Sequence, residues 1–106
     1  MIGIYGCWDD DKNIVYLGTS EKELKKLEWN HRNFDKFKDG YASDFRKALK
    51  EKGDNWKFFW MQPPRAISRR QGEIEEGALI RAFRPLYNKD LYPFETSVSR
   101  GRMQVV

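Results

Sequence analysis

The chain has 106 residues, of which 40% are hydrophobic and 34% are charged, and this size and composition predict one globular domain. Lys and Arg total 20 against 16 for Asp and Glu, so the net charge of +4 is compatible with a polyanionic partner. The single cysteine excludes an internal disulfide and a thiolate metal cluster, and with a single histidine a zinc site is nearly excluded as well. The sequence shows no signal peptide and no apolar stretch that could span a membrane, so we expect a cytoplasmic location and no membrane partner.

The first two elements are predicted to form a β-hairpin. Two short apolar runs, residues 2–8 and 13–18, are joined by a polar, turn-forming segment at 9–13. The first run contains Gly3-Ile4-Tyr5 and the second ends in Tyr16-Leu17-Gly18. Because alternate residues of a strand share a face, Tyr5 should lie on the same face as Cys7, and Tyr16 on the same face as Gly18.

Two helices are predicted to follow the hairpin. Ser20 begins a Ser-x-x-Glu capping box, which predicts a helix from Glu21 to about Phe34. Residues spaced by three and four share one apolar face of this helix: Leu24, Leu27, His31 and Phe34. The second helix is predicted from an N-cap at Ser43 to Lys52, with Gly53 just past its C-terminus.

The remaining elements are a strand and a helix. A third strand is predicted over residues 56–61, with Trp56, Phe58 and Trp60 on one side and Pro63-Pro64 as its end. A third helix is predicted over 69–83, ended by Arg84-Pro85, and residues from 86 onwards are predicted to be irregular, with a mobile tail at 93–106. The order β-β-α-α-β-α predicts an α+β fold, in which a small three-stranded sheet packs with helices.

Glu76 lies on the inward stripe of the third predicted helix. At about 100° per residue, Leu79, Ile80 and Phe83 share one stripe, and Glu76 falls near its middle. An inward carboxylate is unfavourable unless a cation or hydrogen bonds stabilise it. A divalent metal would provide that stabilisation. The alternatives are a glutamate that bends to solvent or one that pairs with an arginine.

Taken together, these motifs resemble those of the GIY-YIG nuclease family. The two N-terminal triplets stand where that family has its own, with Tyr16-Leu17-Gly18 in place of Tyr-Ile-Gly. Glu76 on the third helix and the later Pro85-Leu86-Tyr87-Asn88 match at the family's spacing, so the resemblance covers most of the chain, from Gly3 to Asn88. It implies an antiparallel sheet with helices on both sides, and a metal-dependent DNA endonuclease that hydrolyses phosphodiester bonds.

The resemblance also implies roles for single residues. Glu76 would bind one divalent cation, Mg²⁺ or Mn²⁺, and Tyr5 or Tyr16 would orient or deprotonate the attacking water. Gly18 would leave room for close packing or for the approach of a phosphate. Asn88 would hold the active-site region together through hydrogen bonds, and its alternative role is that of a plain turn residue after Pro85.

His31 has two alternative roles. A lone histidine on an apolar face is commonly a core residue, whereas the resemblance implies a place near the scissile phosphate. The family's arginine, four residues before that histidine, is replaced here by Leu27. Three other residues could supply the missing charge, of which the first is favoured by its spacing from Gly18: Lys26, Arg32 and Arg46.

The expected partner is DNA, with duplex DNA favoured. Gly18 and Arg46 are predicted to contact it, together with three arginines in a stretch that has no acidic residue: Arg65, Arg69 and Arg70. The main alternative is a catalytically weak or inactive nuclease-like module that binds nucleic acid, which the arginine missing at Leu27 favours. A protein-interaction domain that uses exposed aromatic residues is a weaker alternative. The sequence leaves open a homodimer and a separate partner protein that provides specificity.

Overall fold

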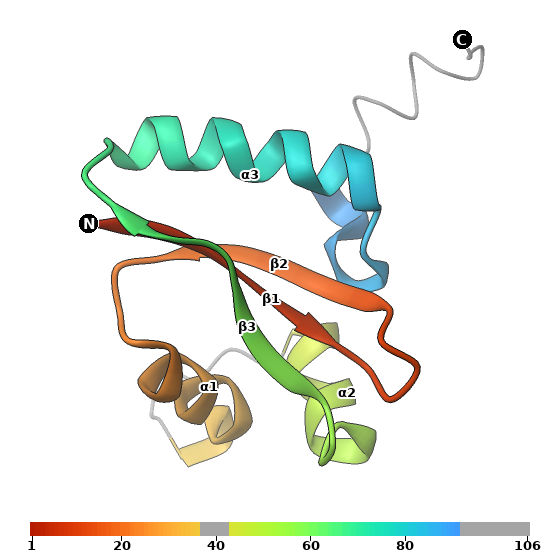
Figure 1. The fold of residues 1–106 in the computed structure, drawn as a ribbon. Coiled ribbons are helices and arrows are strands. Elements are labelled where there is room, and N and C mark those ends of the chain that lie inside the picture. Colours follow the sequence, from red (N-terminus) through yellow and green to blue (C-terminus); the bar gives the residue numbers. More distant parts are fainter. Residues whose placement is uncertain (37–42, 92–106) are drawn as a thin grey trace, which may run out of the picture.

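The computed structural model describes residues 1–36 and 43–91, and it has the predicted α+β fold (Figure 1). Three strands form one antiparallel sheet in the order β2-β1-β3. The strands are β1 (Ile2–Trp8), β2 (Ile14–Ser20) and β3 (Lys57–Arg65). The helices are α1 (Leu24–Arg32), α2 (Asp44–Lys52) and α3 (Arg69–Phe83), with short 3₁₀ helices η1 (Phe34–Lys36) and η2 (Leu86–Leu91). The predicted mobile tail, 93–106, lies outside the described residues.

The sheet lies between two layers of helices. In Figure 1, α3 runs along one face of the sheet, and α1 and α2 lie on the opposite face. The register of the hairpin pairs Tyr5 with Gly18 and Cys7 with Tyr16. Residues paired across an antiparallel ladder share a face, so these four residues lie on one side of the sheet, as the alternation predicted.

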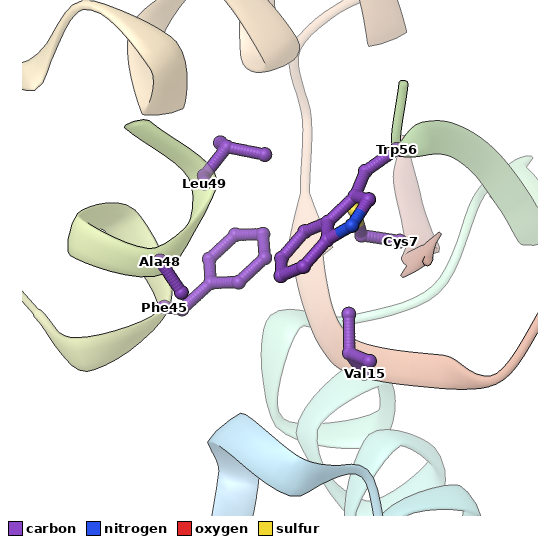
Figure 2. Packing of buried hydrophobic residues seen from close by; sticks show 6 residues of the cluster. All are labelled: Cys7, Val15, Phe45, Ala48, Leu49 and Trp56. Atoms are coloured by element: carbon purple, nitrogen blue, oxygen red, sulfur yellow. The ribbon is translucent and has the colours of Figure 1, made fainter. Parts of the chain in front are cut away.

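A hydrophobic cluster fills the space between the sheet and α2 (Figure 2). It consists of Cys7, Val15, Phe45, Ala48, Leu49 and Trp56. Figure 2 shows the Trp56 ring between the side chains of α2 and Cys7 of β1. Each large apolar side chain that is fully buried in this way stabilises the fold by about 1.5–3 kcal/mol. The cluster therefore fixes α2 against the sheet, and it fixes Phe45 beside Tyr16.

Helices α2 and α3 have the predicted bounds because their ends carry clear signals. Ser43 caps α2 by accepting a hydrogen bond from the Arg46 backbone N–H at 3.2 Å, and Ser68 caps α3 by accepting from the Gln71 N–H at 3.0 Å. Arg84 ends α3 in a left-handed conformation, with φ 48°, and Pro85 follows it. α3 has 15 residues, and no helix in the described ranges is long and apolar enough to cross a membrane.

Several predicted boundaries were wrong, including the end of the second strand, which was predicted at residue 18 and lies at Ser20. The first helix starts at Leu24 rather than at Glu21, because Ser20 ends β2 and its hydroxyl accepts from the Lys22 N–H instead of capping the helix. β3 continues through Pro63 and Pro64 to Arg65. Prolines are tolerated there because β3 is an edge strand, and its register with β1 is irregular at this point. Finally, the segment predicted to be irregular begins with the 3₁₀ helix η2.

Candidate active site

The two tyrosines of the hairpin lie side by side on the face that α1 and α2 cover. Their ring centroids are 6.0 Å apart. The Tyr5 ring lies over Gly18, because a Cβ built on Gly18 would come within 2.6 Å of Cζ and Oη of Tyr5. The glycine of the second triplet is therefore required for packing, in addition to any role in the approach of a phosphate.

His31 connects the tyrosines to a cation. Its Nε2 lies 2.8 Å from the Tyr5 hydroxyl, and its Nδ1 accepts a hydrogen bond from Arg46 Nε at 3.1 Å. Burial and, to a smaller extent, the charge of Arg46 lower the pKa of His31 to about 4. The imidazole is therefore neutral at neutral pH. The core role and the site role that the sequence left open are combined in this one buried residue.

Two phenylalanines enclose His31, and the sequence analysis did not include them in the site. The rings of Phe45 and Phe58 have their centroids 5.3 Å and 5.8 Å from that of His31. Phe45 also stacks on Tyr16 at 4.1 Å with an angle of 3° between the rings. Phe58 was predicted only to share one side of the third strand with Trp56 and Trp60, and such periodicity identifies core residues but does not tell which of them border a polar group.

The pKa values of both tyrosines are raised. Burial raises the pKa of Tyr5 well above its ordinary value, Tyr16 and Glu76 raise it further, and Arg46 lowers it. Burial is also the main cause of the raised pKa of Tyr16, while a hydrogen bond with Tyr5 acts in the opposite direction. Both phenols therefore carry their protons at neutral pH.

Glu76 acts electrostatically on the tyrosines from α3. It lies between Gly72 and Ile80 on one stripe of the helix, and both of those residues are buried. The carboxylate is half-buried, and burial raises its pKa to about 7, with a smaller contribution from Glu73. Its charge raises the pKa of both tyrosines, so it lies within electrostatic reach of them. The predicted inward position of Glu76 agrees with the structure.

Glu76 has the properties of a carboxylate that needs a cation. Among the described residues, none donates a hydrogen bond to it or forms an ion pair with it, so the predicted alternative of an arginine partner is not found there. No group of three or more His, Cys, Asp or Glu residues in the described ranges could enclose a metal ion. A single carboxylate still fits Mg²⁺, because this ion keeps several waters and commonly shares its coordination with a substrate phosphate.

Asn88 is attached to the second triplet by two hydrogen bonds. Its Oδ1 accepts from the Leu17 N–H at 2.8 Å, and its Nδ2 donates to the Leu17 carbonyl at 3.0 Å. Asn88 is 4% exposed, and β2 is an edge strand. The amide thus occupies the position of a missing neighbouring strand. These two hydrogen bonds hold β2 in place, as the resemblance implied for Asn88. Asn88 is therefore more than a turn residue after Pro85.

The three candidate cations lie in different environments. Lys26 is exposed, and at about 100° per residue it lies roughly 140° around α1 from His31. Arg32 donates to Glu28, to the Gly53 carbonyl and to the Trp56 carbonyl at 2.7, 2.9 and 2.9 Å. All three of its guanidinium nitrogens thus hold parts of the chain together. Only Arg46, of these three, is hydrogen-bonded to His31.

The three remaining arginines are exposed near the start of α3. Arg65 pairs with Glu75, and Arg69 pairs with Glu21 at 2.9 Å. The stretch of sequence around these arginines contains no acidic residue, but the fold brings Glu75 to Arg65 and Glu21 to Arg69. Exposed ion pairs contribute little to stability, so Arg65 and Arg69 can exchange a carboxylate for a phosphate at little cost.

No protein-family model matches this chain, and no curated protein is similar to it in sequence. The function is therefore argued below from the geometry of the site and from the motifs of the sequence.

Proposed function

We propose that this protein is a metal-dependent DNA endonuclease of the GIY-YIG type. One observation carries the proposal: a half-buried carboxylate, Glu76, has no partner among the described residues and lies within electrostatic reach of Tyr5 and Tyr16. A carboxylate in this state favours a cation. The α+β fold, the strand order β2-β1-β3 and the two bonds from Asn88 to Leu17 are compatible with the proposal.

Different residues of the chain would have different roles in phosphodiester hydrolysis. Glu76 would hold one Mg²⁺ or Mn²⁺ ion. That ion supplies Lewis-acid polarisation of the phosphate and stabilises the leaving oxygen when it is bound. Tyr5 or Tyr16 would orient the attacking water and handle its proton. Arg46 is favoured over Lys26 and Arg32 as the nearby cation that replaces the arginine missing at Leu27, because it reaches His31.

The second candidate is a nuclease-like module that binds nucleic acid without cutting it. Two observations favour it: Leu27 stands at the arginine position, and the pKa values of both tyrosines are raised, which makes proton abstraction harder. In this case, the exposed arginines Arg65, Arg69 and Arg70 would contribute most of the affinity, and binding would weaken steeply with salt.

The test is incubation of supercoiled plasmid with Mg²⁺, with Mn²⁺ or with EDTA, followed by gel electrophoresis. The matched pair of variants is Glu76→Gln and Glu73→Gln, which remove the same charge from one helix at a half-buried and at an exposed position. We expect cleavage that needs the metal, is lost in Glu76→Gln and persists in Glu73→Gln. Equal cleavage by both variants, or cleavage in EDTA, would contradict the proposal. Salt-sensitive binding without cleavage would support the binding module.

The same gel addresses the assembly that the proposal leaves open. Nicked product is expected from a monomer, and linear product at low enzyme concentration is expected from a homodimer or from an assembly with a partner protein. The preference for duplex over single-stranded DNA is measured by competition with each form. The cytoplasmic location remains a prediction.

A further inference from the structure

Four side chains from four elements lie together, and two hydrogen bonds link three of them. Arg46 comes from α2, His31 from α1, Tyr5 from β1 and Tyr16 from β2. Arg46 Nε lies 3.1 Å from His31 Nδ1, and His31 Nε2 lies 2.8 Å from the Tyr5 hydroxyl. The Tyr16 ring lies beside Tyr5 and His31, with its centroid 6.0 Å from that of Tyr5 and 5.8 Å from that of His31.

The chemistry of these groups sets the direction of both hydrogen bonds. A guanidinium has donors only and keeps its protons in proteins, so Nδ1 of His31 must be the acceptor. The neutral ring then carries its hydrogen on Nε2, and this hydrogen is donated to the Tyr5 oxygen. The Tyr5 oxygen thus accepts from His31, so its own hydrogen points away from the imidazole and is available to another acceptor, such as the neighbouring Tyr16.

The surroundings keep this arrangement in place. The Phe45 and Phe58 rings enclose the imidazole, and His31 is 8% exposed. Hydrogen bonds that are shielded from water in this way are stronger than exposed ones, and a chain of them polarises along its length. Tyr5 is 4% exposed, whereas Tyr16 is only half-buried, so solvent has more access to the Tyr16 side chain than to that of Tyr5.

We infer that Arg46 is a positioning residue: by holding His31 in the tautomer with hydrogen on Nε2, it makes the Tyr5 oxygen an acceptor and turns the Tyr5 hydrogen away from His31. The more exposed Tyr16 is then the tyrosine that faces the attacking water. His31 cannot accept the Tyr5 proton, because the nitrogen next to Tyr5 already carries a hydrogen. The part that concerns the water rests on the proposed function, whereas the tautomer does not.

The first test measures the tautomer without any activity. His31 is the single histidine of the chain, so ¹⁵N-histidine labelling gives one pair of ring nitrogen signals. At neutral pH we expect a protonated Nε2 and an unprotonated Nδ1. Arg46→Met, which removes the donor at similar side-chain length, should give a mixture of the two tautomers. Arg46→Lys, which keeps a donor, should give the wild-type tautomer with hydrogen on Nε2. Lys47→Met, at the exposed neighbouring position, should change nothing.

Two results would overturn the inference at this stage. One is a wild-type ring with its hydrogen on Nδ1, and the other is an unchanged tautomer in folded Arg46→Met. Amide spectra of each variant establish that it is folded. Should Arg46→Met fail to fold, the wild-type spectrum still decides the tautomer.

The second test compares the tyrosines by plasmid cleavage. We expect Tyr16→Phe to reduce the rate by about a hundredfold, the low end for a positioned proton-handling group, and Tyr5→Phe to reduce it by a few-fold. Arg46→Met should lower kcat more than it weakens DNA binding, and Arg46→Lys should recover part of kcat. A larger loss in Tyr5→Phe than in Tyr16→Phe would contradict the assignment. If the wild type cuts no DNA, the proposed function is wrong. The role of Arg46 in setting the His31 tautomer is then decided by the ¹⁵N measurement alone.

Discussion

The side-chain amide of Asn88 bonds to both backbone polar groups of Leu17, accepting at 2.8 Å and donating at 3.0 Å. Leu17 is the middle residue of the second triplet, and its neighbours Tyr16 and Gly18 both contribute to the candidate site. This contact connects η2 to the edge strand β2, and it joins parts of the chain that are 71 residues apart. The position of the second triplet therefore depends on a residue near the end of the described chain.

Asn88→Ala should destabilise the protein by roughly 2 kcal/mol. The substitution leaves a buried N–H and a buried carbonyl of Leu17 without partners. Each buried polar group that loses its partner destabilises the fold by about 1–3 kcal/mol. The measurement is urea unfolding, with Asn55→Ala at an exposed position as the control. Equal midpoints for the two variants would mean that the Asn88 amide contributes nothing to stability.

Gly18→Ala and Gly77→Ala should change stability in opposite directions. A Cβ on Gly18 would lie 2.6 Å from Tyr5 Cζ and Oη, so the ring must move, and overpacking of this kind costs about 1–3 kcal/mol. A Cβ on Gly77 meets only Arg81 Nη1 at 3.6 Å, so the gain in helix propensity should stabilise that variant by up to about 1 kcal/mol. Thermal unfolding measures both changes.

The displaced Tyr5 ring should also release His31. We therefore expect the ring nitrogen signals of His31 to shift in Gly18→Ala and to remain unchanged in Gly77→Ala. Unchanged signals and unchanged stability in Gly18→Ala would show that the hairpin accepts a methyl group at this position.

Glu76→Gln should stabilise the metal-free protein at pH 8 and leave it almost unchanged at pH 4. The folded-state pKa of Glu76 is raised to about 7, against an ordinary value of 4.5. As the pH rises from 4.5 to 7, the unfolded chain loses this proton while the folded chain keeps it, so the carboxyl group destabilises the fold increasingly across this window. The neutral glutamine has no such pH dependence.

The expected gain at pH 8 is roughly 1–3 kcal/mol in the free energy of unfolding, reduced by solvent access to the half-buried group. Urea unfolding in EDTA at both pH values measures it. Mg²⁺ should reverse the order of the two proteins at pH 8, because a bound ion stabilises only the wild type. A variant that is less stable than the wild type in EDTA at pH 8 would contradict the unpartnered state of Glu76.

Arg32→Met should reduce stability, whereas Lys26→Met should be nearly neutral. Arg32 donates hydrogen bonds to Glu28 and to the carbonyls of Gly53 and Trp56. A hydrogen bond that involves a charged group contributes about 1.5–3 kcal/mol to stability. Exposed Lys26 should change stability by less than about 0.5 kcal/mol. Denaturant unfolding of the two variants separates a structural arginine from an exposed lysine. Similar, small effects would reopen Arg32 as a candidate for phosphate binding.

Much of the fold follows from patterns within a few residues. Ser43 and Gly53 mark the ends of α2, and the stripe of α3 places Glu76 inward, because caps and helical periodicity act over one or two turns. The prediction failed where the strand context decided the outcome. Ser20 belongs to β2 and cannot begin a helix, and Pro63-Pro64 remains within β3 because β3 is an edge strand.

The sequence by itself determined the elements, their order and the residues that face inward, because these depend on local propensity and on periods of two and 3.6 residues. Only the tertiary structure decided which cation reaches the site. Spacing favoured Lys26, yet the packing of α2 against the sheet brings Arg46 to His31 from another helix. Local periodicity specifies the face of one helix, whereas a contact between two helices depends on how both pack on the sheet.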